Sequence, residues 1–149
     1  MRGIKRKDTD PELRVRRWLH ARGVRFTTEN RDLPGSPDLA NRSRKWAIFV
    51  HGCFWHGHAD CHKATTPKRN REFWLDKIAR NRTRDAAKAR ALEELGYTVY
   101  TVWECELKEL ARAGDFDDLT FKLPRPAELV SSKAPMPRRS SSLRAAVSC

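Results

Sequence analysis

The sequence predicts an α/β fold with a mixed β-sheet, and three observations support this prediction. Trp46 to Val50 is an unbroken apolar run of strand length, and Tyr97 to Trp103 is expected to be a final buried strand. Between them, Glu72 to Leu95 has the length and the apolar positions of one long helix. With the elements predicted upstream, the order is helix, three strands, helix, strand, which is typical of α/β domains. A chain of 149 residues is expected to form one such domain.

The first helix is expected at about residues 11 to 22. Thr9 supplies a capping side chain, a proline follows in the first turn, and Glu12 places an acid near the positive end of the helix dipole. Gly23 suits the C-terminal cap. Residues 1 to 8 are mostly basic or polar, and we expect them to be disordered.

Two short strands are expected before the central one. Val24 to Thr28 is the first, and a turn over Leu33 to Pro37 leads into the second at Asp38. The central strand ends directly at His51. From His51 to Arg71 there is no periodicity, and a loop of this length needs a ligand or a metal to hold it.

Two segments follow the last strand. Glu104 to Arg112 is expected to be a short helix that completes the folded domain, which we place at residues 9 to 112. Residues 113 to 149 are rich in Pro, Ser, Arg and Ala. Their apolar content is too low to form a core, so we expect a disordered tail.

The composition indicates a basic protein with a nucleic-acid partner. Lysine and arginine total 31 against 19 acidic residues, and a formal charge of +12 is what a chain that follows a polyphosphate backbone would carry. No apolar run approaches the ~18 residues of a membrane span, and the N-terminus lacks the apolar stretch of a signal peptide. We therefore expect no membrane association and a cytoplasmic location. Nucleotide-binding glycine loops of the Gly-x-x-x-x-Gly-Lys and Gly-x-Gly-x-x-Gly kinds are absent.

A zinc site is indicated between His51 and His62, where four histidines and two cysteines fall within twelve residues. Cytosolic thiols are kept reduced, so a metal site is favoured over disulfides. The expected ligands are Cys53, His58 and Cys61 from this loop and Cys105 after the last strand. His62 or His56 could replace His58. Four protein ligands leave no open position, so the zinc would be structural. The alternative is a pair of ordinary buried thiols, with histidines that face solvent.

Asp38 is the candidate ligand for a harder cation. It follows Ser36-Pro37 and opens a strand that should neighbour Val50 and His51, so its carboxylate is placed to hold magnesium. A lone aspartate after a proline is more often a turn residue. The surrounding motifs decide between these two interpretations.

A series of short motifs runs through most of the chain. They are Pro11-Glu12, Gly35-Ser36-Pro37-Asp38, Phe49-Val50-His51-Gly52-Cys53-Phe54-Trp55-His56, Glu72-Phe73-Trp74-Leu75-Asp76-Lys77-Ile78, Asn81 with Arg84-Asp85, Glu94-Leu95-Gly96 and Val102-Trp103-Glu104-Cys105. In order and spacing they resemble the Vsr mismatch endonucleases over about residues 9 to 110. One departure is His58-Ala59-Asp60-Cys61, which is one residue longer than the usual family pattern and leaves His58 favoured over His62 as the zinc ligand.

The resemblance implies a nuclease core related to the type II restriction endonucleases, which we take as the fold of residues 9 to 112. In those enzymes a Pro-Asp motif is usually followed by Glu-x-Lys, whereas this chain has Phe49-Val50-His51 after its Pro37-Asp38. That departure is characteristic of the Vsr branch. The resemblance also implies that Asp38 and the backbone carbonyl of Val50 bind magnesium, which would stabilise the phosphorane charge and the leaving oxygen.

Catalytic roles follow from the same resemblance. His56 would activate the attacking water, because a histidine with a pKa near 6.5 can accept a proton at neutral pH. His51 would support the phosphate or the transition state, and Asp85 would orient His56. Glu12 would reach the metal region through water.

Aromatic side chains carry the remaining part of the resemblance. Large aromatics are more often core residues, but Phe54 and Trp55 lie between a zinc ligand and the candidate base, where a packed strand cannot bury both. The resemblance implies that they wedge into the base stack at the mismatch, with Trp74 assisting. Contacts to phosphate or base edges are expected from Asn81, Arg82 and Arg84.

The implied function is a nick on the 5′ side of a thymine opposed to guanine in double-stranded DNA, in repair of deaminated 5-methylcytosine. The protein is expected to act as a monomer, because a mismatch has no need of two-fold symmetry. Mismatch-repair proteins could recruit it. Two alternatives stay open: a non-catalytic zinc-containing module that binds distorted DNA, and a related structure-specific nuclease of a defence system or a mobile element.

Overall fold

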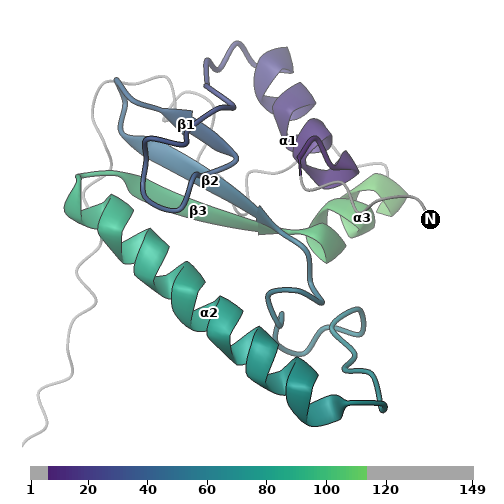
Figure 1. Cartoon of the computed structure of the whole chain (residues 1–149). Helices are drawn as coiled ribbons and strands as arrows, with labels where there is room; N and C mark the ends of the chain where they lie inside the picture. The colour runs from purple at the N-terminus through teal and green to yellow at the C-terminus, as the bar shows by residue number, and fades with distance from the viewer. Residues whose placement is uncertain (1–6, 114–149) are drawn as a thin grey trace, which may run out of the picture.

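The structure is a computed structural model that describes residues 7–113. The predicted N-terminal extension and tail therefore lie almost wholly outside the described residues. Figure 1 shows the described part as a small central sheet with helices packed around it.

The sheet is mixed, as predicted, and has three of the four expected strands. β1 (Leu39–Asn41) pairs antiparallel with β2 (Trp46–His51), and β2 pairs parallel with β3 (Thr98–Trp103), in the order β1-β2-β3. The parallel register runs from Trp46 opposite Thr98 to His51 opposite Trp103. Parallel neighbours need a crossover, and the helix that connects β2 to β3 provides it.

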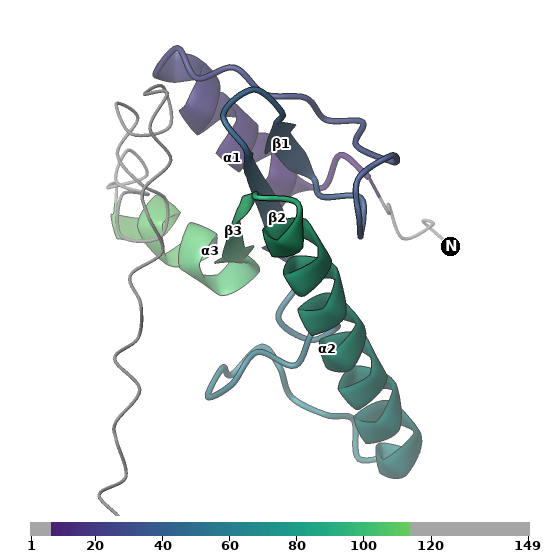
Figure 2. The same ribbon diagram turned by 90° about the vertical axis from the view of Figure 1, so that its left-hand side faces the viewer.

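Helices cover both faces of the sheet, as the two views in Figures 1 and 2 show. α1 (Asp10–Ala21) and α3 (Glu104–Ala113) lie on one face, and α2 (Arg71–Glu94) crosses the other. All three helices begin and end within one residue of their predicted bounds. The order of elements confirms the predicted α/β class.

Side chains along β2 point alternately to the two faces of the sheet, so the core consists of two clusters. Trp46 and Ile48 face α1 and α3, where they pack with Val15, Trp18, Leu19, Leu39, Val102 and Leu107. Ala47 and Phe49 face the other way and pack with Ala40, Leu92 and Tyr97 beneath α2. Leu92 is the buried residue of α2, so only the C-terminal part of this helix is anchored in the core.

The expected strand over Val24 to Thr28 was wrong. One bridge forms, in which Thr27 and Ala40 exchange backbone hydrogen bonds of 2.8 and 3.1 Å. Beside it, the side-chain amide of Asn41 donates to the carbonyl of Arg25 at 2.8 Å. β1 is only three residues long, so it offers too short an edge for a full ladder, and side chains satisfy the backbone instead.

Candidate active site and metal centre

The first part of the site lies where β1 begins and β2 ends. The two strands run antiparallel, so Asp38, just before β1, lies beside the end of β2. Its Oδ2 accepts a hydrogen bond from the backbone N–H of Val50 at 2.7 Å. The structure thus brings Asp38 and Val50 together, as the sequence predicted from strand order.

The turn before Asp38 is fixed by a buried amide. Asn30 is 2% exposed, and its Nδ2 donates to the carbonyls of Thr27 and Pro37, both at 3.0 Å. The second of these bonds ties down the peptide that leads into Asp38. Sequence reasoning missed Asn30, because its partners are backbone atoms that no motif marks.

Burial raises the pKa of the Asp38 carboxyl from 3.8 to about 6, and the nearby Glu12 carboxylate adds to the rise, whereas the Val50 N–H opposes it. Removal of a carboxylate from water disfavours its charged form. A cation beside Asp38 would reverse that penalty. The chemistry of this oxygen ligand therefore fits a hard divalent metal.

Glu12 completes this side of the site. It is 6% exposed, and its carboxylate accepts from the Asp8 N–H at 3.0 Å and the Thr9 hydroxyl at 2.9 Å. The expected cap by the Thr9 side chain was wrong, because that hydroxyl donates to Glu12 and caps no backbone N–H. Arg16 contacts Glu12 at 3.4 Å, and the three side chains of Glu12, Arg16 and Asp38 line a hollow of about 170 Å³.

The second part of the site is a pair of stacked histidines with an aspartate. The rings of His51 and His56 are nearly parallel, with centroids 4.0 Å apart. His56 Nδ1 lies 2.5 Å from Asp85 Oδ2, which fixes the orientation of the ring. Since Nδ1 is engaged, Nε2 is the nitrogen left to exchange a proton with water.

His51 differs from His56 in its electrostatic environment. Burial lowers the pKa of His51 to about 4, and the neighbouring His56 lowers it further. A neutral His51 can donate or accept one hydrogen bond at physiological pH. The ligand atoms of His51, His56 and Asp85 also lie close enough together to hold a metal ion, since all are within 4.8 Å of one another.

A separate centre gathers the sulfur ligands. One ligand atom from each of Cys53, His58, Cys61 and Cys105 lies within 4.8 Å of the others. Cys105 Sγ is 3.2 Å from His58 Nδ1, and tetrahedral zinc at ordinary bond lengths separates its ligand atoms by about 3.5–3.8 Å. His62 is exposed and lies outside this group, and His56 is bonded to Asp85.

Two thiols of this centre, those of Cys53 and Cys105, are favoured in their protonated form when no cation is present, whereas the pKa of Cys61 is lowered because backbone hydrogen bonds from Lys63 and Ala64 outweigh its desolvation. Burial raises the pKa of Cys105 to about 12, and the nearby Cys53 sulfur raises it further. Burial also raises the pKa of Cys53. A thiolate-binding metal would draw off these protons, so the donor set fits zinc.

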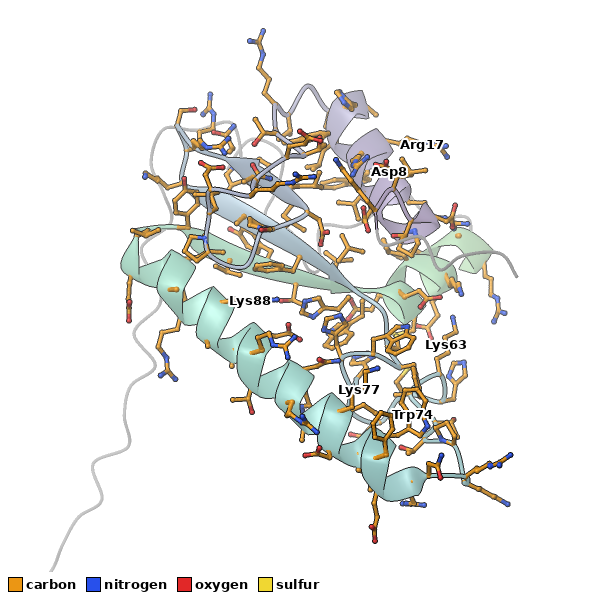
Figure 3. The ribbon with its side chains drawn as sticks, viewed as in Figure 1. Asp8, Arg17, Lys63, Trp74, Lys77 and Lys88 are labelled. Atoms are coloured by element: carbon orange, nitrogen blue, oxygen red, sulfur yellow. The ribbon has the colours of Figure 1, made fainter. Side chains whose placement is uncertain are left out.

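The third part of the site is a cluster of aromatic rings on the loop after β2 and the start of α2. Phe54, Trp55 and Trp74 lie with their ring centroids 5.1 to 6.1 Å apart, and Trp55 is 38% exposed. Phe73 joins them and is 56% exposed. Lys77 places its ammonium 5.3 Å from the Trp55 and Trp74 rings, and Figure 3 shows it beside Trp74 on α2.

The polar residues of α2 take three positions around this cluster. Asn81 Nδ2 donates to the carbonyl of Trp55 at 2.9 Å, so it ties the aromatic loop to the helix. Arg82 lines a hollow of about 470 Å³ between α2 and β3, together with His56 and Asp85. Arg84 is exposed. Sequence reasoning missed Lys77, although it lies one helical turn after Trp74.

No helix in residues 7–113 is both long and apolar enough to cross a bilayer.

Comparison with known proteins gives consistent matches. A family model described as DNA mismatch endonuclease Vsr matches residues 1–63. The chain is 42% identical over 123 residues to the DNA mismatch endonuclease Vsr of Escherichia coli (strain K12), covering 83% of this chain and 78% of that protein. It is 46% identical over 110 residues to the type II nicking enzyme V.XorIIP of Xanthomonas oryzae pv. oryzae, covering 74% and 80%. With the type II nicking enzyme V.NmeAIP of Neisseria meningitidis it shares 44% over 108 residues, covering 72% and 76%.

Proposed function

Because this chain belongs to the Vsr family of DNA mismatch endonucleases, we propose that it nicks one DNA strand on the 5′ side of the thymine in a T·G mismatch. The nick would start repair of deaminated 5-methylcytosine. The observation that supports this most is the meeting of the Asp38–Val50 pair and the His56–Asp85 pair at one end of β2. A metal-dependent hydrolase that cuts a phosphodiester needs a cation site and a base side by side.

In the proposed mechanism Asp38 and the carbonyl of Val50 would hold magnesium, and Glu12 would contact the same region through water. Bound magnesium supplies positive charge that stabilises the phosphorane and the leaving oxygen. His56 accepts a proton from the attacking water at Nε2, while Asp85 holds Nδ1 and stabilises the resulting imidazolium. His51, neutral at physiological pH, would donate a hydrogen bond from its ring N–H to a phosphate oxygen.

We assign Cys53, His58, Cys61 and Cys105 to structural zinc. These residues close a four-ligand set, which leaves no position for a reacting water. Cys105 is the second residue of α3, which follows β3 directly, so the metal would fasten the loop after β2 to the core. That loop has no regular secondary structure from 52 to 70 and would gain its order from this attachment.

The exposed aromatic cluster is proposed to recognise the mismatch. Phe54 and Trp55 would enter the base stack with Trp74 behind them, and unstacking costs less at a mismatch than at a matched pair. The exposed Arg84, with Arg82 and the free part of Asn81, would contact phosphate or base edges.

We also propose how the chain is organised around the active site. The nuclease unit would span residues 9 to 112 with a core related to the type II restriction endonucleases, flanked by disordered segments at 1–8 and 113–149. It would act in the cytoplasm as a monomer, with mismatch-repair proteins as further partners.

The test is strand-specific nicking. Labelled duplexes with one T·G mismatch in several sequence contexts are incubated with magnesium, beside matched duplexes and the Asp38→Ala protein. Nicks on the thymine strand that disappear in Asp38→Ala are the expected result. Binding without any cut by zinc-loaded protein would instead support a recognition module, and cuts at branched or single-stranded DNA alone would support a structure-specific nuclease.

A further inference from the structure

Lys88 is a cation at the candidate active site that the mechanism above does not use. It lies on α2 three residues after Asp85, so the two side chains share one face of the helix. Its Nζ is 3.9 Å from Asp85 Oδ1. Figure 3 shows Lys88 directed from α2 into the angle between the helix and the sheet.

The stem of Lys88 is held in place by the turn that precedes Asp38. A Cβ atom added to Gly35 would lie 2.6 Å from Lys88 Cβ and 2.7 Å from its Cγ and Cδ. Only glycine allows so close an approach, and its φ of +74° is a second reason for glycine here. The turn and the helix therefore position the ammonium jointly, between the two halves of the active site.

The ammonium of Lys88 has donors to spare. The 3.9 Å separation from Asp85 is longer than the 2.7–2.9 Å of a charge-assisted hydrogen bond, and Asp85 gives its other oxygen to His56. Within residues 7–113 Nζ makes no hydrogen bond. By contrast, Arg16, the cation on the opposite side of the site, is engaged by Asp8 at 2.6 Å and by Glu12.

The negative charges of the site favour a cation such as Lys88 at this position. Glu12, Asp38 and Asp85 are carboxylates, and a DNA phosphate brings a further negative charge among them. A metal beside Asp38 neutralises one side only. Lys88 supplies positive charge on the histidine side, because its Nζ lies 3.9 Å from Asp85, the partner of His56.

We propose that Lys88 is a phosphate-binding residue of this nuclease, whose ammonium leaves Asp85 and donates a hydrogen bond to a non-bridging oxygen of the phosphate at the cleavage site. The inference rests on the proposed function, because it takes the DNA backbone to lie across Asp38 and His56. It gives the site a lysine from α2, whereas the end of β2 has Phe49-Val50-His51 in place of a Glu-x-Lys motif.

The test compares Lys88→Met with Arg90→Met. Arg90 is exposed and two residues further along α2, about 200° around the helix, so its variant removes the same charge away from the site. Lys88→Gln and Lys88→Arg complete the set, and zinc content with circular dichroism confirms that each protein folds. Single-turnover nicking and mismatch binding across a salt series are measured for all of them.

Lys88→Met is expected to slow nicking at least tenfold. It should also reduce the slope of log affinity against log salt concentration by about 0.9, which is the value for the loss of one phosphate contact. Lys88→Arg should retain most of the rate, and Arg90→Met should nick like the unaltered protein. Duplexes with one neutral methylphosphonate supply the direct assay. Binding of the unaltered protein and of Lys88→Met should become equal when the methylphosphonate replaces the contacted phosphate, and should differ at every other position.

Two results would overturn the assignment. One is a Lys88→Met protein that nicks and binds like Arg90→Met. The other is a binding defect of the same size at every methylphosphonate position, which would show a general charge effect. If the unaltered protein nicks nothing, the proposed function fails, and the methylphosphonate series still decides whether Lys88 contacts a phosphate.

Discussion

Replacement of Asp38 by asparagine should abolish nicking and at the same time stabilise the magnesium-free protein. The carboxyl has a pKa of about 6 in the folded chain against an ordinary value of 3.8, chiefly because it is buried. At pH 8 the ionised form therefore costs the folded state about 3 kcal/mol. Asparagine removes this cost and keeps an oxygen that can accept from the Val50 N–H.

The stabilisation of the magnesium-free protein by Asp38→Asn should depend on pH. Between pH 3.8 and 6 the folded protein binds more protons than the unfolded chain, so the stability of the unaltered protein falls as pH rises through this window. The advantage of Asp38→Asn should therefore be full above pH 7. It should shrink as pH falls through 6 and be lost near 3.8.

Urea unfolding of zinc-loaded protein, followed by tryptophan fluorescence at pH 8 and pH 5, measures this difference. Asp32→Asn is the matched control, because that carboxylate is exposed beside Arg42 and its loss should change the free energy of unfolding little. Magnesium should raise the stability of the unaltered protein and leave Asp38→Asn unchanged. An Asp38→Asn protein that is equal or lower in stability at pH 8 would refute the argument from burial.

Three further substitutions test other parts of the site. Asp85→Asn should slow nicking by about 10²–10⁴ with mismatch affinity unchanged, because His56 loses the group that orients its ring; equal loss of binding in a gel-shift assay would contradict this. Cys105→Ser should lower the zinc content measured by mass spectrometry and the melting temperature together, and a full complement of zinc in the folded variant would exclude Cys105 as a ligand. Trp55→Ala should weaken mismatch binding by about 1–3 kcal/mol with little loss of folding stability, since the ring is 38% exposed; matched duplex, titrated in parallel, should be bound almost as before.

Most of the fold could be predicted because its signals are local. β2 is an apolar run, β3 is rich in aromatic and β-branched residues, and apolar spacing with boundary residues such as Gly23 predicted the helix ends to within one residue. The failed strand over Val24 to Thr28 has strand-like composition, but whether it pairs depends on β1, which is only three residues long. Pairing is a property of two segments distant in sequence, so neither segment alone reveals it.

The candidate site, like the fold, could be predicted from the sequence only where its signals are local. Ligand chemistry alone singled out Cys53 and Cys105, which the structure brings close across the sheet end. Lys88 carries no such signal, because a lysine three residues after an aspartate is common on exposed helices. Its place at the site depends on how α2 crosses the sheet and on how closely Gly35 approaches it.

The long helix gives this small domain two regions of unequal local stability. α2 has 24 residues, about 36 Å, yet it is anchored in the core at Leu92 near its end, and its N-terminal half extends beyond the sheet in Figures 1 and 2. The aromatic cluster lies at this projecting half, with Trp74 on the helix and Phe54 and Trp55 on the loop beside it, where few apolar contacts oppose local opening. On the recognition role proposed above, substitutions there would change what the protein recognises at little cost to the core. The same separation would let a preference for particular DNA change without a prior gain of stability elsewhere.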